Sequence, residues 1–486
     1  MIMDIIDALH NKTIFKPLFK DLRTWHAWEV YLRALFGLSI TDAKDRGLFK
    51  ECTGLSKPPD ERARESYVIC GRRSGKSYMS AVIAAYLASF RDWKPYLSPG
   101  ERGWIFIIAN DKAQAGIIKA YISGIFHRVK SLKLLVEKET VETLELKNGI
   151  NIAVKTASFR AIRGYTVLAG ILEEIAFWRS EDSANPDKEI LAAIRPALAT
   201  IPESLLLGIS TPYSRGGVLF DKFRAHYGKS GGPLIWKAPT RTMNPTIDKR
   251  LIESALKEDP QAAAAEWEAE WRQDIEAFIT QELVEAATVP GRFELPRLEN
   301  VRYYAFADPS GGRQDSFTLG ISHRESSGKI ILDVLRERRP PFQPKAVVSE
   351  YAQLLKSYGL AEVTADRYAG EWVASAFREY GIMLRPSELS ASEIYLNFLP
   401  LISNGSVELL DVKRLAGQLT GLERRARSGG NDQVTHYPGG HDDLSVAAAG
   451  VCVLAQAPRN EPNIRRLFTP GESPKPAFRG GRMSLA

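Results

Sequence analysis

Eight consecutive residues decide the fold of this chain: Cys70-Gly71-Arg72-Arg73-Ser74-Gly75-Lys76-Ser77. They follow the apolar run 67–69 and precede residues 78–90, which are rich in helix-forming residues. A strand, a glycine-containing turn and a helix in this order are typical of a phosphate-binding loop, whose backbone N–H groups surround phosphate oxygens. We therefore expect Lys76 to reach the β- and γ-phosphates of a nucleotide and Ser77 to bind Mg²⁺. The alternative is a basic strand-to-helix turn without a ligand.

The loop departs from the usual pattern in two respects. Cys70 stands where the motif has its first glycine, and Arg72 and Arg73 lie inside the loop. Small residues are compatible with the turn, so we interpret the stretch as a variant nucleotide-binding loop. On this interpretation all of residues 70–77 contribute to cofactor binding.

Length and charge limit the class of protein. At 486 residues the chain exceeds one ordinary domain core and should divide into at least two domains. A formal charge of +7 favours a polyanionic partner, with nucleic acid as the leading candidate. The three cysteines are far apart in the sequence, which argues against structural zinc or a disulfide framework and fits a reducing cytosol. We find no signal-peptide pattern and no apolar run of membrane-spanning length, so we expect neither export nor membrane insertion.

The first half of the chain predicts a helical segment and then an α/β domain. Residues 1–60 carry apolar and aromatic residues at helical spacing, which we interpret as core. The alternative is that Trp25 to Trp28 lies beside the adenine of a bound nucleotide. Residues 61–245 alternate strand and helix patterns, which predicts a mainly parallel sheet with helices on both faces.

Two carboxylates end a buried strand of this domain. The mostly apolar run 166–172 leads directly into Glu173 and Glu174. In sheets of this type ligands bind at the carboxyl ends of the strands, where paired carboxylates suit Mg²⁺ binding and activation of the attacking water. We assign Glu173 to the metal, through water, and Glu174 to the attacking water. Asp is usual at the first position, and the alternative for the pair is an acidic helix N-terminus.

Further residues are candidates for transition-state contact and coupling. Arg163 could contact the γ-phosphate of a neighbouring subunit, and Arg72 could do so within its own chain. An arginine that is only solvated is the alternative for each. Ser210 and Thr211 end the next buried strand, 205–210, where hydroxyl groups could sense phosphate or simply cap the strand end.

The second half of the chain predicts a connector, a second domain and a tail. Residues 246–297 suggest a helical connector followed by a proline-containing linker, with the domain boundary near Leu298. Residues 298–456 show three strands, a helix, a further strand and a late apolar helix. This is the ribonuclease H order of elements. Residues 457–486 lack apolar periodicity, so we expect a disordered tail.

Four acids in the second domain occupy strand ends and a helix start. Asp308 and Asp366 end predicted strands, and Asp442 and Asp443 begin the last helix. Each acid alone is typical of a turn or helix cap. Together they predict a metal-dependent nuclease site, because two Mg²⁺ or Mn²⁺ ions held by carboxylates can activate water and stabilise the leaving oxygen of a phosphodiester. We favour Asp443 over Asp442 as a ligand, and His441 is a candidate auxiliary group.

The predicted fold class is α/β, with a P-loop (RecA/ASCE-like) ATPase domain followed by a ribonuclease H-like nuclease domain. The arginine-bearing loop, the Glu173-Glu174 strand end, Ser210-Thr211 and the nuclease acids together resemble the large terminase subunit of tailed bacteriophages. The resemblance spans about residues 25–455 and is specific as an ensemble of motifs.

This resemblance implies a viral DNA-packaging motor subunit, in which ATP hydrolysis drives double-stranded DNA into a procapsid and the nuclease cuts the concatemer. The implied cofactors are ATP and Mg²⁺, with Mn²⁺ able to substitute at the nuclease site. The implied partners are double-stranded DNA, a portal protein, a small terminase subunit and further copies of the chain in a ring, without a membrane. The implied location is the host cytoplasm.

Two other classes of protein stay open from the residues alone. One is a cellular helicase or repair ATPase with a fused nuclease, although the chain shows a single nucleotide-binding core where many helicases pair two. The other is a structural DNA-binding protein with degenerate sites, against which Lys76, Glu174 and the nuclease acids argue.

Overall fold

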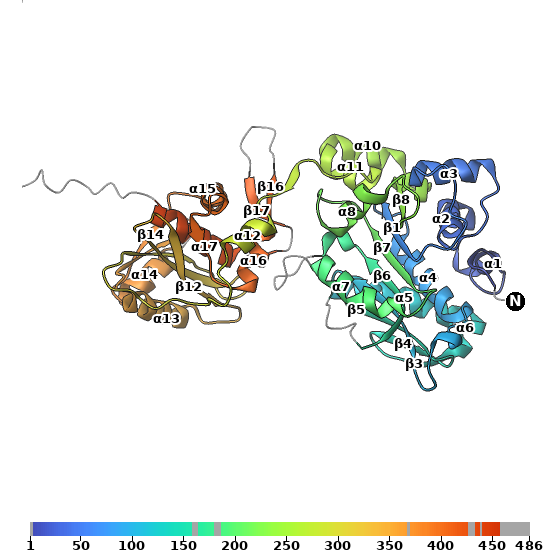
Figure 1. Ribbon diagram of the computed structural model, residues 1–486, viewed down its shortest axis with the longest axis horizontal. Coiled ribbons are helices and arrows are strands. Elements are labelled where there is room, and N and C mark those ends of the chain that lie inside the picture. The colour runs from blue at the N-terminus through green and yellow to red at the C-terminus, as the bar shows by residue number, and fades with distance from the viewer. Residues whose placement is uncertain are drawn as a thin grey trace, which may run out of the picture.

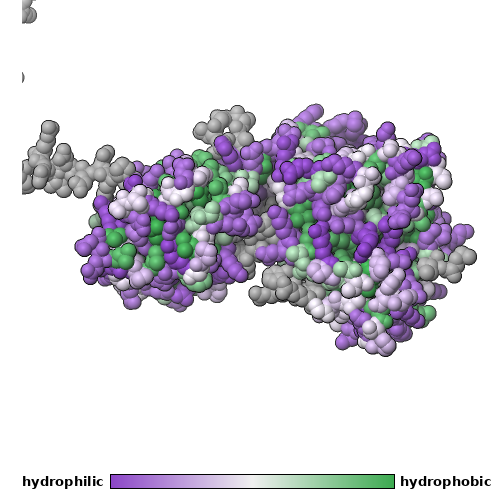
Figure 2. Space-filling model, in the orientation of Figure 1, coloured by the Kyte–Doolittle hydropathy of each residue, from purple (hydrophilic) through white to green (hydrophobic). Residues whose placement is uncertain are grey.

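The computed structural model describes residues 3–157, 164–178, 186–366, 370–425, 433–437 and 440–456. These residues form two bodies, each built around its own large β-sheet (Figure 1). Polar residues cover much of the visible face of both bodies, with small apolar patches between them (Figure 2). In this described part of the chain, no helix is both long and apolar enough to cross a membrane.

The first sheet is mainly parallel, as the alternating sequence pattern predicted. In spatial order it consists of β3 (Val136–Glu139), β4 (Thr143–Leu146), β5 (Ile150–Thr156), β2 (Gly103–Ala109), β6 (Thr166–Glu173), β7 (Leu205–Ser210), β1 (Glu65–Cys70) and β8 (Leu234–Ala238). All neighbours in the spatial series β5-β2-β6-β7-β1-β8 pair in parallel. At the other edge, β3 and β4 pair antiparallel with each other, and β4 pairs antiparallel with β5.

The order of the central strands positions the first site. β7 lies between β1, which leads into the phosphate loop, and β6, which ends in Glu173. This is the strand order of ASCE-type P-loop ATPases, and it confirms the fold predicted for this part of the chain. Because the strands are parallel, the loop, the Glu173-Glu174 pair and Ser210-Thr211 all emerge at one edge of the sheet.

Helices cover both faces of the first sheet. One face carries α1 (Ile5–His10), α2 (His26–Leu35), α3 (Ala43–Thr53), α4 (Lys76–Phe90), α5 (Lys112–Arg128) and α6 (Lys130–Leu135), and the other carries α7 (Pro186–Ala199) and α8 (Gly217–His226). Four 3-10 helices, Lys16–Leu18, Leu22–Trp25, Lys94–Tyr96 and Ile175–Phe177, join these described elements.

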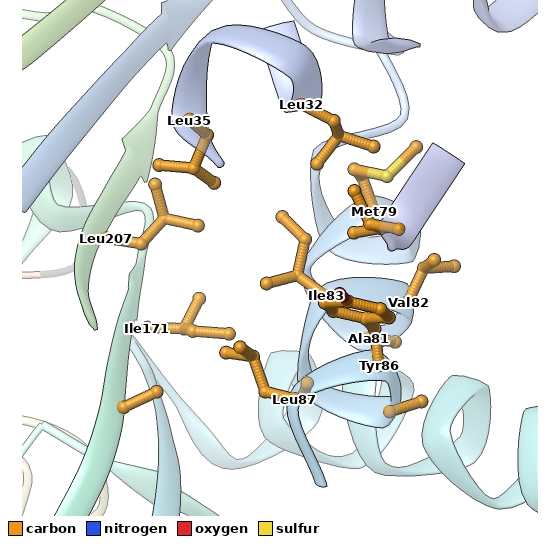
Figure 3. Packing of buried hydrophobic residues seen from close by; sticks show 14 of the residues in the cluster. Leu32, Leu35, Met79, Ala81, Val82, Ile83, Tyr86, Leu87, Ile171 and Leu207 are labelled. Atoms are coloured by element: carbon orange, nitrogen blue, oxygen red, sulfur yellow. The ribbon is translucent and has the colours of Figure 1, made fainter. Parts of the chain in front are cut away.

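Helix α4 follows the phosphate-binding loop directly and is buried on nearly all of its sides. Ile83 and Leu87 of α4 point towards Ile171 of β6 and Leu207 of β7 in the core (Figure 3). Burying a side chain of this size stabilises the fold by roughly 1.5–3 kcal/mol. The apolar sequence of 78–90, which predicted a helix, therefore also anchors the loop that precedes it.

The second sheet has the predicted ribonuclease H arrangement. In spatial order it consists of β14 (Met383–Pro386), β13 (Glu362–Ala365), β10 (Tyr303–Asp308), β11 (Phe317–Arg324), β12 (Ile330–Arg338) and β15 (Val407–Glu408). β10, β11 and β12 are antiparallel neighbours, and β13 pairs parallel with β10. Asp308 and Asp366 therefore end adjacent parallel strands.

The second sheet is also covered on both faces. One face carries α13 (Pro344–Ser357) and α14 (Glu371–Glu379), and the other carries α12 (Gln281–Ala287), α15 (Ala391–Ser403), α16 (Lys413–Thr420) and α17 (Asp443–Gln456). Small residues let α17 approach the sheet closely: a Cβ added to Gly450 would lie 2.7 Å from the ring of Phe306. This contact fixes the helix that begins with Asp443.

The segment between the two large sheets contributes to both bodies. After β8 it forms α9 (Thr240–Met243), α10 (Lys249–Glu258) and α11 (Pro260–Glu268). It then forms β9 (Ile275–Ala277), which joins β16 (Leu422–Arg425) and β17 (Gln433–His436) in a third sheet. Phe278 and Val284 pack in the core of the second body. We therefore propose a domain boundary near residue 273, whereas the sequence placed it near Leu298.

Candidate active sites

The phosphate loop is held from the N-terminal side by two tryptophans. The indole N–H of Trp28 donates to the carbonyl oxygen of Ser74 at 2.7 Å, and Trp28 is fully buried. Trp25 packs over Gly75, where a Cβ would lie 2.5 Å from its ring and φ is +86°. Only glycine combines this left-handed backbone with so close an approach. Trp28 is thus part of the core, and Trp25 lies at the site.

The loop is held from the other side by residues that follow the sheet. The Thr240 hydroxyl donates to the carbonyl of Arg72 at 2.8 Å, and the Asn244 amide donates to the carbonyl of Arg73 at 2.8 Å. The backbone N–H of Arg72 donates to the carbonyl of Glu266 at 2.6 Å. Helices α9 and α11 therefore touch the loop directly, which the sequence pattern did not indicate.

Lys76 is buried where the loop and the neighbouring strand ends meet. Its Nζ donates to Thr211 Oγ1 at 2.8 Å and to the carbonyl of Gly71 at 3.2 Å, and it lies 3.4 Å from Glu174 Oε1. Burial lowers the pKa of Lys76, but the carboxylates of Glu174 and Glu173 raise it by more, so the ammonium stays charged. The predicted phosphate ligand is therefore a pre-positioned cation.

Glu174 is fixed by the end of the adjacent strand. Its Oε2 accepts hydrogen bonds from Ser210 Oγ at 3.1 Å and from the backbone N–H of Thr211 at 3.2 Å. Its backbone has φ +52°, a left-handed conformation that is uncommon for a residue with a side chain and often found at functional sites. The predicted coupling residues thus contact the two charged groups at this edge, Ser210 contacting Glu174 and Thr211 contacting both Glu174 and Lys76.

Glu173 is fully buried beside the start of α4. One carboxylate oxygen accepts from Ser77 Oγ at 3.2 Å and the other from Ser80 Oγ. Burial raises the pKa of Glu173 to about 7; the Glu174 carboxylate adds to this rise, and the hydrogen bonds from the two hydroxyl groups oppose it. The two residues predicted to serve Mg²⁺, Ser77 and Glu173, therefore lie in direct contact.

We expect Glu173→Gln to stabilise the nucleotide-free protein, and more at pH 8 than at pH 5. The pKa of Glu173 is about 7 in the folded protein against an ordinary 4.5. The protonated side chain therefore contributes its full share to the free energy of unfolding below pH 4.5, and this share is lost as the pH rises through 7. A shift of this size corresponds to up to about 3 kcal/mol. Thermal unfolding of both proteins in EDTA at the two pH values measures the effect. An advantage of the variant that does not grow with pH would contradict it.

An open cavity of about 1030 Å³ extends from the loop. Lys76 and Ser77 line one end, and aromatic side chains of Trp25, Tyr78 and Tyr121 line the wall beside it. The rings of Trp25 and Tyr78 are 5.6 Å apart, and those of Tyr78 and Tyr121 are 5.3 Å apart. The cavity is large enough for a nucleotide, with a charged end for phosphates and an aromatic wall for a base.

Of the two arginines predicted to contact the γ-phosphate, the structure describes only Arg72. Arg72 is largely exposed and lies 3.3 Å from Glu266 Oε1, beside the cavity. Arg163 lies outside the described residues. The choice between them stays a prediction.

The acids of the second body also meet at one edge. Asp308 ends β10, and the backbone N–H of Asp366 donates to the carbonyl of Ala307 at 3.2 Å, which places these two acids side by side. Burial and then the carboxylates of Asp443, Asp366 and Asp442 raise the pKa of Asp308 well above its ordinary value. Like charges within reach of one another are characteristic of sites that hold cations.

The helix-start pair is held in place by the neighbouring sheet and helix. Asp443 Oδ2 accepts from the backbone N–H of Ser316 at 3.2 Å, and burial raises the pKa of Asp443 to about 6. Asp442 Oδ2 accepts from the Tyr395 hydroxyl at 3.1 Å, and burial raises its pKa as well. Both acids face the same cavity, so the structure does not separate a main ligand from a second one.

A cavity of about 450 Å³ covers this edge, and it is lined by Asp308, Asp442 and Asp443, while Asp366 lies outside its lining. Two residues that the sequence reasoning missed also line it, Asp315 and His436. Asp315 lies two residues before the start of β11 and is 3.5 Å, Oδ1 to Nδ1, from the predicted auxiliary group His441. Strand-end position was the signal that could have found Asp315.

The donor set suits a hard divalent cation in its chemistry, since carboxylate oxygens predominate. Among the residues that the structure describes, no three side chains of His, Cys, Asp or Glu stand close enough together to hold an ion as they are. Carboxylates at this edge would hold such a cation next to one another; burial first, and then the neighbouring carboxylates, raise the pKa of Asp308. Asp308, Asp366, Asp442 and Asp443 are the residues that would hold the cation.

No protein-family model matches the chain, and no curated protein matches it significantly. Among solved structures it is similar to the large terminase of bacteriophage HK97, with 15% identity and a TM-score of 0.37 over 86% of this chain and 95% of that one. It is similar to the large terminase of a thermophilic bacteriophage in complex with ATP-gamma-S, with 11% identity and a TM-score of 0.35 over 86% and 96% of the two chains. It is also similar to the large terminase nuclease of the thermophilic phage G20c with bound magnesium, with 19% identity and a TM-score of 0.30 over 37% and 96%.

Proposed function

We propose that this chain is an ATP-driven DNA-packaging motor subunit that also cuts DNA, the role implied by its resemblance to large terminase subunits. One joint observation carries the proposal. A single chain places Lys76, Glu174 and Thr211 together at the edge of an ASCE-ordered sheet, and places Asp308 and Asp443 together at the edge of a ribonuclease H-ordered sheet.

In the first site, each residue has a separate role in the hydrolysis of ATP. Lys76 holds the β- and γ-phosphates and balances their charge, in exchange for its present contact with Glu174. Glu174 orients the attacking water and accepts its proton, while Ser210 and Thr211 hold the carboxylate in place. Ser77 and Glu173 would hold Mg²⁺, which when bound neutralises charge on the phosphates.

In the second site, Asp308, Asp366, Asp442 and Asp443 would hold Mg²⁺ or Mn²⁺ at the scissile phosphodiester. The bound ions would supply an activated water and stabilise the leaving oxygen. Asp443 is buried and Asp308 is partly buried, so neither carboxylate is fully open to bulk water. Asp308 and Asp366 stand at the ends of the neighbouring strands β10 and β13, so a cation held by both would lie where these strands end.

The partners follow from the resemblance and from the net positive charge of the chain. ATP is the substrate of the first site, and double-stranded DNA is both moved by the motor and cut at the second site. A portal protein, a small terminase subunit and further copies of the chain in a ring complete the assembly, which acts in the host cytoplasm. In such a ring Arg163 would act on the nucleotide of the next subunit, and Arg72 on its own.

A mixing experiment separates the two arginines. If Arg163 acts between subunits, Arg163→Ala should lower ATPase activity by about 10³-fold or more, and addition of Glu174→Gln subunits should restore part of it. The rescue arises because an inactive Glu174→Gln subunit still donates its own Arg163. Phosphate release measured across mixing ratios, with portal protein present, reports the rescue. No rescue at any ratio, with Arg72→Ala inactive alone, would assign the role to Arg72.

The direct test of the proposed function is one incubation of the full chain with plasmid DNA, ATP and Mg²⁺ or Mn²⁺. We expect DNA cleavage and phosphate release in the same sample. A helicase with a fused nuclease would in addition unwind a forked duplex, so strand displacement without packaging activity favours that alternative. Absence of both cleavage and phosphate release would favour a structural DNA-binding protein.

A further inference from the structure

The cavity of the second body is lined by a histidine, His436, whose hydrogen bond to a carbonyl oxygen shows which ring nitrogen carries the proton. His436 ends β17, and its Nδ1 lies 2.8 Å from the carbonyl oxygen of Tyr437. A carbonyl oxygen only accepts hydrogen bonds, so Nδ1 carries the proton. In the neutral imidazole the lone pair is then on Nε2, the nitrogen that lies 4.0 Å from Asp442 Oδ1.

Asp442 is oriented to meet that nitrogen. Its Oδ2 accepts from the Tyr395 hydroxyl at 3.1 Å, and this hydroxyl is itself 2.7 Å from Ser445 Oγ. The carboxylate is therefore anchored through one oxygen, and the other oxygen faces His436. Two acceptor atoms, Nε2 and Oδ1, are held side by side and both residues line the cavity.

We propose that His436 is a nitrogen ligand for a divalent cation bound with Asp442, an inference that rests on the proposed nuclease function. A histidine that binds a metal nearly always donates its other ring N–H to a carbonyl or carboxylate, which is the arrangement of His436 and Tyr437. Ligand atoms on one octahedral ion at about 2.1 Å are about 3 Å apart in adjacent positions and about 4.2 Å apart in opposite ones. At 4.0 Å, Nε2 and Oδ1 are about 1 Å further apart than adjacent ligands, so a shift of about 1 Å brings both onto one ion.

The proposal agrees with the scarcity of close ligand groups at this edge. Mg²⁺ and Mn²⁺ sites on nucleic-acid enzymes take one or two protein side chains and complete their coordination with water and substrate phosphates. An imidazole ligand favours Mn²⁺ or Co²⁺ over Mg²⁺, because Mg²⁺ prefers oxygen. His441 offers a matched comparison, since it lines the same cavity but its Nδ1 lies beside Asp315.

The test is pulsed EPR of the full chain with Mn²⁺ and without nucleotide, which detects a ¹⁴N nucleus bound to the ion. We expect nitrogen coupling in the unaltered protein and in His441→Gln, and its loss in His436→Gln together with a Mn²⁺ affinity at least about 10-fold lower. His436→Asp should recover Mn²⁺ binding without nitrogen coupling, which separates loss of a ligand from loss of fold.

Two results would overturn the proposal. Bound Mn²⁺ and DNA cleavage without nitrogen coupling, or coupling that disappears in His441→Gln instead, would refute the role of His436 and leave the nuclease function standing. No Mn²⁺ binding and no cleavage by the unaltered chain would refute the nuclease function and the ligand assignment together.

Discussion

Lys76→Ala and Glu174→Gln are each expected to abolish ATP hydrolysis, but by different routes. Lys76 is the buried cation that meets Thr211 and Glu174 at the strand ends, so its loss removes phosphate binding as well as turnover. Glu174→Gln keeps the size of the side chain and its contact with Ser210, and removes only the carboxylate that we propose accepts the proton of the attacking water. It should therefore bind nucleotide normally and turn over about 10²- to 10⁴-fold more slowly.

Phosphate release and nucleotide binding measured on the same preparations separate these two routes. Trp25 lines the cavity, so its fluorescence offers a binding signal that does not depend on turnover. Asp308→Asn is the matched control, because it alters the other body and should leave phosphate release unchanged. Normal turnover in Glu174→Gln would refute its role as the base, and normal nucleotide binding in Lys76→Ala would refute the phosphate loop.

The sequence predicted those parts of the two sites that depend on strand order alone. Parallel strands end at one edge, so a carboxylate pair after one strand and Ser210-Thr211 after the next had to lie near the phosphate loop. The same reasoning placed Asp308 and Asp366 side by side. A local pattern therefore predicts which residues lie together when the fold forces the ends of its elements together.

Residues that reach the sites through packing could not be found in this way. Thr240 and Glu266 support the phosphate loop from helices far along the chain, and nothing in their own neighbourhoods marks them. His436 reaches the acid-lined cavity of the second body because β17 pairs with β16, a pairing that the sequence pattern did not reveal. Such contacts depend on the relative positions of whole elements, which periodicity and motif spacing do not specify.

Asp308→Asn is expected to abolish DNA cleavage and at the same time to stabilise the protein without metal. Asp308 is buried among other acids, and both burial and their charges raise its pKa well above the ordinary value. A raised pKa means that the stability contributed by this group is complete at low pH and is lost as the pH rises, so at neutral pH the ionised carboxylate destabilises the fold. Removing the charge relieves that repulsion, while it also removes a cation ligand.

Asp333→Asn is the matched control, since Asp333 is a fully buried acid of the same sheet that lies outside the cavity. It pairs with His323 Nδ1 at 2.7 Å; burial raises its pKa too, and the hydrogen bond from His323 opposes that rise. The two variants are therefore distinguished by plasmid cleavage with Mn²⁺, which Asp308→Asn should lose and Asp333→Asn should keep. Thermal unfolding with EDTA measures the stabilisation expected for Asp308→Asn. Asp366→Ala should resemble Asp308→Asn in losing cleavage while the full chain keeps its ATPase activity. Equal metal-dependent cutting by the unaltered chain and by Asp366→Ala would show that this acid only caps its strand, and the two-metal nuclease would be refuted with it.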